Sequence, residues 1–125
     1  MIENGTYENR WDDSQSILIA ELNGFWTLDV VAAWKADLSE RLGENDGPFD
    51  MLGDIRRHSI QTKEVMEAMT EVGRYLKARG LRRGAALVGD SALVKMQVAR
   101  TVNAADLFST PFNSEAEALA WLRAE

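Results

Sequence analysis

Several residues of types found in active sites lie in one stretch of the sequence, MLGDIRRHSIQT at positions 51–62. It holds Asp54, Arg56 and His58, the one histidine of the chain, ahead of two hydroxyl side chains. A histidine can serve as a general base because its ordinary pKa lies near neutrality. A base also needs an orienting group and a nucleophile or water beside it, and no serine elbow or pair of carboxylates accompanies this histidine. We therefore predict a protein that is not an enzyme, and we expect His58 to be dispensable for whatever activity it has.

The composition narrows the remaining kinds of site. The 125 residues include no cysteine and a single histidine, so we expect no disulfide, metal site or cofactor. The formal charge of −6 argues against nucleic acid as a partner, because such binding depends on Lys and Arg that neutralise phosphates. The sequence has no secretion signal at its start and no run of about 20 apolar residues that could span a bilayer. A cytoplasmic location is therefore expected.

Hydrophobic periodicity predicts the elements that position this stretch. Residues 6–11 alternate in polarity and precede a turn, so we predict an antiparallel hairpin with residues 17–22. The second strand of this hairpin is apolar at nearly every position, as expected inside a sheet that is covered on both faces. Further strands are predicted at residues 49–54, 84–90 and 106–109.

Helices should alternate with these strands. They are predicted from a cap at Thr27 to Gly43, over residues 61–79, onward from about Ser91, and after a capping box that begins at Ser114. The order is then ββαβαβαβα in one domain over residues 1–125. Because βαβ connections are nearly always right-handed crossovers between parallel strands, the fold class is α/β. We expect one mixed sheet, with the N-terminal hairpin antiparallel, the later strands parallel and the helices packed on it.

The carboxyl ends of the parallel strands form the expected binding edge, because ligands of open α/β sheets gather there. That edge should carry Asp54, Arg56, Asp90, Ser91 and Ser109. Asp54, Arg56 and Ser91 could form the polar rim of a crevice that orients a ligand head or a charged group of a partner. Alternatively, Asp54 accepts backbone N–H groups at the strand exit while the arginines lie in water.

The third predicted helix is apolar on two sides. Its valines can face the sheet, while Leu93 and Met96 belong to a second apolar strip about 100° round the helix. Another helix of the chain, a second subunit or an apolar ligand could cover this strip. We predict that Leu93, Met96 and Trp26 line one cavity or interface near Asp54, since pockets combine apolar walls with a few polar groups.

A basic cluster, KARGLRRG at residues 77–84, surrounds the predicted end of the second helix. Cations at a helix C-terminus interact favourably with the helix dipole. The same cations could instead attract the protein to an anionic membrane surface.

The element order and four pieces of sequence resemble the SpoIIAA-like group of STAS-related proteins. These pieces are LNGFWTLD, MLGDIR, GAALVGD and FNSEAEALAWL, and the likeness spans about residues 17–122. The resemblance implies a small bacterial cytosolic domain that binds partners or apolar ligands. It also implies a phosphorylatable serine after the central strand, but Ile55 and Arg56 stand at the matching positions. We therefore predict no regulated phosphosite of this kind at Ser59 or its neighbours.

The function predicted from these observations is that of a non-enzymatic STAS-like module. It would bind a partner protein or a small apolar ligand at the strand-end crevice, and a second copy of the chain is one candidate partner. A peripheral lipid-binding or membrane-associating carrier is the first alternative. An enzyme of unknown reaction is the second.

Overall fold

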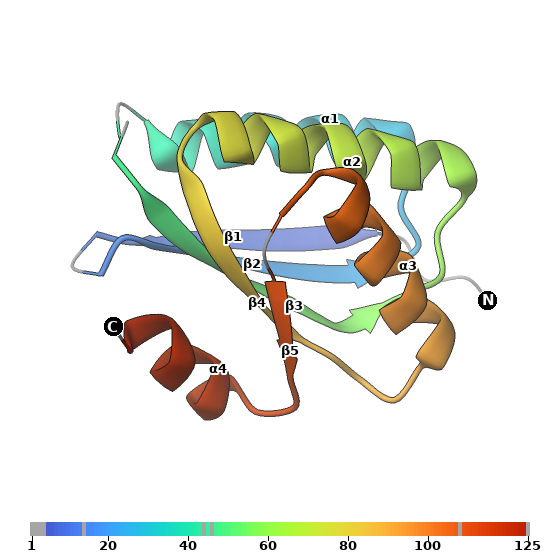
Figure 1. Cartoon of the computed structure of the whole chain (residues 1–125). Helices are drawn as coiled ribbons and strands as arrows, with labels where there is room; N and C mark the ends of the chain where they lie inside the picture. The colour runs from blue at the N-terminus through green and yellow to red at the C-terminus, as the bar shows by residue number, and fades with distance from the viewer. Residues whose placement is uncertain (1–4, 14, 44, 46, 108, 125) are drawn as a thin grey trace.

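The computed structural model describes residues 5–13, 15–43, 45, 47–107 and 109–124. Its strands form one five-stranded sheet in the order β1-β2-β3-β4-β5, with helices on both faces (Figure 1). The elements follow one another as β1 (Thr6–Asp12), β2 (Ile17–Gly24), α1 (Leu28–Leu42), β3 (Phe49–His58), α2 (Lys63–Ala78), β4 (Leu81–Leu87), α3 (Ala92–Ala104), β5 (Ser109–Phe112) and α4 (Glu115–Arg123). The predicted order ββαβαβαβα and the α/β class are confirmed.

The sheet is mixed, as the sequence predicted. β1 pairs with β2 antiparallel, from Thr6 opposite Asn23 to Asp12 opposite Ile17. The pairs β2–β3, β3–β4 and β4–β5 are all parallel. β2 therefore lies inside the sheet, and its residues are buried or half-buried throughout, which explains why this strand is apolar at nearly every position.

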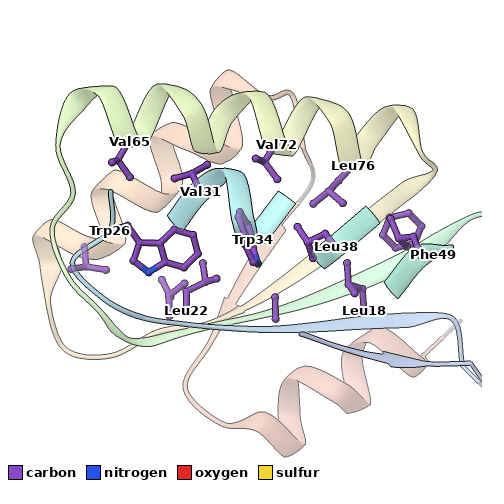
Figure 2. Close-up of a cluster of buried hydrophobic side chains, with 14 residues drawn as sticks. Leu18, Leu22, Trp26, Val31, Trp34, Leu38, Phe49, Val65, Val72 and Leu76 are labelled. Carbon is purple, nitrogen blue, oxygen red and sulfur yellow. The ribbon is translucent and has the colours of Figure 1, made fainter. Parts of the chain in front are cut away.

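Two apolar cores lie on opposite faces of the sheet because successive strand residues point to opposite sides. The larger core is covered by α1 and α2, with a contribution from α3 (Figure 2). Its labelled members in Figure 2 are Leu18, Leu22, Trp26, Val31, Trp34, Leu38, Phe49, Val65, Val72 and Leu76. The smaller core packs Ala118 and Leu122 of α4 against Ile17, Leu52 and Leu87 on the other face. One face thus carries three helices and the other carries α4.

Helix ends follow local sequence signals. Thr27, Thr62, Ser91 and Ser114 are the four N-caps, and each side chain accepts a hydrogen bond from the backbone N–H three residues further on. Such caps satisfy one of the backbone donors that a helix leaves free at its start. Gly80 follows α2 with φ 113°, a conformation that favours glycine. A Cβ there would also lie 2.8 Å from the carbonyl oxygen of Gly47.

Three strand boundaries differ from the sequence-based prediction. β3 continues four residues beyond Asp54 because β2 still offers backbone partners, with Asn23 opposite Arg57 and Gly24 opposite His58. β4 lies three residues earlier than predicted, at Leu81–Leu87. β5 begins at Ser109, which pairs with Gly84 of β4. The predicted strand over residues 106–109 therefore lies three residues too early, and its residue 108 lies outside the described residues.

Candidate functional site

A cavity of about 140 Å³ lies between the sheet and the helices α2 and α3. Small residues on adjacent strands leave its floor open. Gly53 of β3 stands opposite Ala86 of β4, and Gly84 lies two residues before Ala86 on the same strand. All three line the cavity. A Cβ built on Gly53 would meet no heavy atom of the described chain within 4 Å, so this glycine borders empty space.

The walls of the cavity are apolar and come from two helices. α2 contributes Met66 and Met69, and α3 contributes Val98 and Val102. Methionine is flexible and polarisable, so it adapts its shape to what it contacts. Apolar cavities of about 150 Å³ in other proteins stay free of water and take up benzene or xenon. This cavity is comparable in size.

Two glutamine side chains make hydrogen bonds to backbone groups at the cavity lining, and the one on α3, Gln97, joins that helix to the loop before α2. The backbone N–H of Gln61 donates to Oε1 of Gln97 (2.8 Å), and Nε2 of Gln97 donates to the carbonyl of Gln61 (3.0 Å). The Gln61 side chain accepts from the backbone N–H of Trp26 (2.8 Å) and donates to the carbonyls of Gly24 and Ser59. Both amides are therefore engaged within the protein.

His58 also lines the cavity, and it differs from the two glutamines in having a buried side-chain atom without a hydrogen bond. Its ring is 7% exposed and lies edge-on to Trp26, with ring centroids 5.6 Å apart. Its Nδ1 is buried and has no hydrogen-bond partner among the described residues. Burial lowers the pKa of His58 to about 4, so the ring is neutral at physiological pH.

A β-bulge explains how His58 reaches this face. Met51, Gly53 and Ile55 line the cavity, whereas Asp54 and Arg56 lie on the opposite face of the sheet. Strict alternation would next direct residue 57 to the cavity. Between its pairings with Glu21 and Asn23 of β2, however, β3 advances by three residues while β2 advances by two. The extra residue brings His58 to the helix-covered face.

Because burial lowers the pKa of His58, we predict that the folded protein becomes less stable as the pH decreases. Between about pH 6.5 and pH 4 the unfolded chain binds the proton and the folded chain does not, so the free energy of unfolding decreases as the pH falls. Between pH 7 and pH 5 the loss attributable to His58 should be about 2 kcal/mol. Urea unfolding at both pH values, with His58→Phe as the control, measures it. Equal pH dependence of the two proteins would contradict the prediction.

The residues predicted to line one cavity do not do so. Trp26 is 1% exposed, and its indole N–H donates to the carbonyl of Asn23 (2.8 Å). Leu93 and Met96 are 54% and 43% exposed, and these three side chains are not among the described residues that line the cavity. The structure does not place the three side chains around this cavity, because Trp26 packs into the core under α1 while α3 directs its valines inward. A role of Leu93 and Met96 in contact with a partner stays a prediction.

Asp54 and Arg56 form an ion pair on the α4 side of the sheet, away from the cavity. Nε and Nη2 of Arg56 donate to the carboxylate of Asp54 at 3.0 and 2.7 Å, and the backbone N–H of Arg56 donates to it at 3.1 Å. Burial acts to raise the pKa of Asp54, but the hydrogen bonds from Arg56 outweigh it and hold this pKa below its usual range. The pair lines a polar groove with Glu8, Arg10 and Glu115.

Ser91, the third member of the predicted rim, and Ser109, which was predicted at the strand-end edge, do not meet Asp54 and Arg56. Ser91 is the N-cap of α3, where its Oγ accepts from the backbone N–H of Val94 (3.2 Å). Ser109 begins β5 instead of ending it, so it lies at the amino end of its strand and lines the cavity there. The structure therefore does not bring Asp54, Arg56 and Ser91 together around a crevice with Trp26, Leu93 and Met96.

The basic cluster at residues 77–84 is engaged within the protein. Arg82 donates to the buried carboxylate of Asp50 at 3.1 and 2.9 Å. Arg83 lies 3.6 Å from the same carboxylate and donates to the carbonyls of Leu122 and Ala124 at the end of α4. Asp50, which the sequence analysis did not single out, therefore anchors two cations at the amino ends of β3 and β4.

Sequence reasoning missed the cavity, although a signal for it was present. Glycine in the interior of a strand weakens the strand and often marks a gap or a close approach. Gly53 and Gly84 are such residues, on adjacent strands. Within the described residues, no group of three acidic or histidine side chains is placed to hold a metal ion. In the same part of the chain, no helix is long and apolar enough to cross a bilayer.

Comparison with known proteins identifies the fold. No protein-family model matches the sequence, and no curated protein matches it. Among solved structures, the chain is similar to an uncharacterized protein of the DUF3478 family with a SpoIIAA-like fold from Shewanella loihica PV-4. The two chains are 15% identical and superpose with a TM-score of 0.73 over 98% of this chain and 95% of the other. The likeness confirms the SpoIIAA-like fold that the sequence predicted.

Proposed function

We propose that this chain, with its SpoIIAA-like fold, is a non-enzymatic binding module that holds one small apolar molecule between the sheet, α2 and α3. The observation that carries the proposal is the open floor of the cavity at Gly53. Protein interiors are packed about as densely as organic crystals, and an empty space deprives its lining of dispersion contacts. A bound apolar molecule would supply those contacts.

The lining supports binding rather than catalysis. His58 is the one titratable side chain among the described residues that line the cavity. General acid–base chemistry needs further groups placed around the reacting atoms, and the nearby glutamine amides are already engaged with the protein. We therefore propose that the ligand binds on the helix-covered face of the sheet and not in the strand-end crevice that the sequence predicted.

The size of the cavity sets the first probe. At about 140 Å³ it matches cavities that take up benzene, so benzene is the appropriate test molecule. We expect a saturable NMR titration in which the backbone amides of Gly53, Ala86 and Val98 shift most. Thermal unfolding should move to higher temperature with benzene concentration, because a ligand that binds only the folded state stabilises it.

The control is the Gly53→Val protein, whose new side chain would occupy the floor of the cavity. It should show neither the local amide shifts nor the rise in unfolding temperature. The proposal would be wrong if wild type gave no saturable shift, or if the valine variant bound benzene equally well. Native mass spectrometry of the untreated purified protein would reveal a molecule already bound.

A further inference from the structure

We propose that a second site, a crevice on the α4 side of the sheet, binds the phosphate group of a small soluble phosphomonoester. The crevice has a volume of about 680 Å³ and is lined by Arg82, Arg83 and Arg123. Ile17 and Leu122, which belong to the smaller core under α4, also line it. The crevice therefore lies on the face opposite the apolar cavity, and its ligand is independent of the apolar molecule proposed above.

The crevice carries a surplus of positive charge. Three arginines line it, and Asp50 is the one acidic side chain among the described residues that do so. Three positive charges against one negative charge leave two that are not balanced within the described lining. The whole chain has a formal charge of −6, so this local excess runs against the average composition. A ligand group with two negative charges would balance it.

The arginines keep N–H donors that the protein does not use. A guanidinium has five such donors. Arg82 donates to Asp50 through Nε and Nη2. Arg83 donates through Nη2 to two backbone carbonyls, and Arg123 donates through Nε to Gln15. Within the described residues, no hydrogen bond uses Nη1 of any of the three, so each can donate to a ligand.

Two of the guanidinium groups are already held in place. Asp50, whose side chain is 4% exposed, accepts from Arg82 at 3.1 and 2.9 Å. Arg83 lies over the ring of Trp121, 4.9 Å from the ring centroid, and donates to the carbonyls at the end of α4 at 2.6 and 2.9 Å. The free protein has therefore already lost the conformational entropy of these two side chains, which lowers the cost of binding.

Charge and shape select a phosphate monoester. The planar N–H groups of arginine match the oxygens of phosphate and carboxylate. A phosphate monoester carries about −1.5 to −2 charges near neutral pH, which balances the excess, whereas one carboxylate balances only half of it. The volume of the crevice falls within the usual range of about 300–1,000 Å³ for small-molecule pockets, so it can hold an organic group as well as the phosphate.

A soluble molecule suits this site better than a membrane does. The formal charge of −6 opposes approach to an anionic bilayer. Most phospholipid headgroups are also phosphate diesters, which carry a single negative charge and would leave part of the excess unbalanced.

Glycerol 3-phosphate is the probe that tests this site. The full chain labelled with 15N would be titrated by NMR at about pH 7.5, where the monoester is mostly a dianion, with the ionic strength held constant because salt screens such contacts. We expect saturable shifts of the backbone amides of Gln15, Arg82 and Arg123. Glycerol alone should cause none. The absence of a saturable shift in wild type would overturn the proposal.

Two variants with the same change of charge give the matched comparison. Arg123→Gln removes one lining cation whose side chain is exposed, and it leaves the contacts of Asp50 intact. It should weaken binding of glycerol 3-phosphate about tenfold, the usual worth of a hydrogen bond between charged groups. Arg100→Gln changes an exposed arginine of α3 that does not line the crevice and should leave the affinity unchanged. Equal losses in the two variants would indicate a general effect of net charge and would contradict the site.

Two further probes identify the source of the phosphate group. Inorganic phosphate should shift the same amides and should also bind more weakly to Arg123→Gln. Vesicles that contain phosphatidic acid should not sediment the protein. Saturable binding of inorganic phosphate without binding of glycerol 3-phosphate would rule out an organic ligand. Sedimentation with vesicles, without binding of the soluble ester, would replace the soluble ligand by a membrane and overturn the proposal.

Discussion

Replacing Gly53 with valine is expected to raise the free energy of unfolding by about 3 kcal/mol and to abolish binding of small apolar molecules. The new Cβ would meet no described heavy atom within 4 Å, so the side chain begins in open space. Each buried methylene or methyl group adds about 0.8 kcal/mol, and removing glycine from a strand adds roughly 0.5–1 kcal/mol more. Urea unfolding measures the gain, and a benzene titration measures the loss of binding.

Gly73 provides a matched control in the same cavity lining. A Cβ at Gly73 would lie 2.9 Å from the Cβ of Ala105 and 3.2 Å from a methyl group of Leu107. Because Ala105 has no flexible side chain that could move aside, the end of α3 would have to shift. Gly53→Ala should therefore stabilise the protein, whereas Gly73→Ala should destabilise it even though alanine is the better helix former. Effects of the same sign would indicate that the space at Gly53 is not open.

Replacing Asp50 with alanine is expected to lower the free energy of unfolding by about 3 kcal/mol, near the usual cost of removing one partner from a buried ion pair. The Asp50 side chain is 4% exposed and accepts two hydrogen bonds from Arg82, and Arg83 lies 3.6 Å away. Without this carboxylate, the half-buried Arg83 would keep its charge with no counter-ion in the same place. Urea unfolding at neutral pH measures the loss.

Arg82→Ala is the control for this prediction. The Arg82 side chain is 62% exposed, so water can solvate its charge, whereas the Asp50 carboxylate is only 4% exposed. The carboxylate would also retain Arg83 as a neighbour. Removing Arg82 should therefore cost much less than removing Asp50. Equal losses would show that the burial of the carboxylate is not what makes this ion pair important.

Local patterns in the sequence determined the elements, their order and the faces they bury. Alternation in residues 6–11 and the apolar run that starts at Ile17 predicted the hairpin, because strand side chains alternate between two faces. Thr27 and Ser114 predicted helix starts, since their side chains bond backbone groups only three residues away. Gly80 predicted the end of α2 through its own backbone conformation. Each of these signals acts within one or two turns of chain.

Strand boundaries depended on partners far away in the sequence. The apolar pattern of β3 stops near Asp54, but the strand continues to His58 because Asn23 and Gly24 of β2 still pair with it. The bulge in this pairing brings His58 to the cavity side. No local property of residues 54–58 encodes the position of the bulge, since it depends on the register between two strands.

Only the tertiary structure decided where the apolar surfaces meet. The sequence showed that Trp26 is apolar and that Leu93 and Met96 lie on one apolar strip of α3. In the structure Trp26 lies in the core, while the two α3 residues are largely exposed. The cavity arises because Gly53, Ala86 and the inner sides of α2 and α3, which are distant in sequence, enclose a space that their side chains do not fill. Periodicity determines which side of an element is apolar, whereas the volume left between elements depends on how closely several of them approach one another.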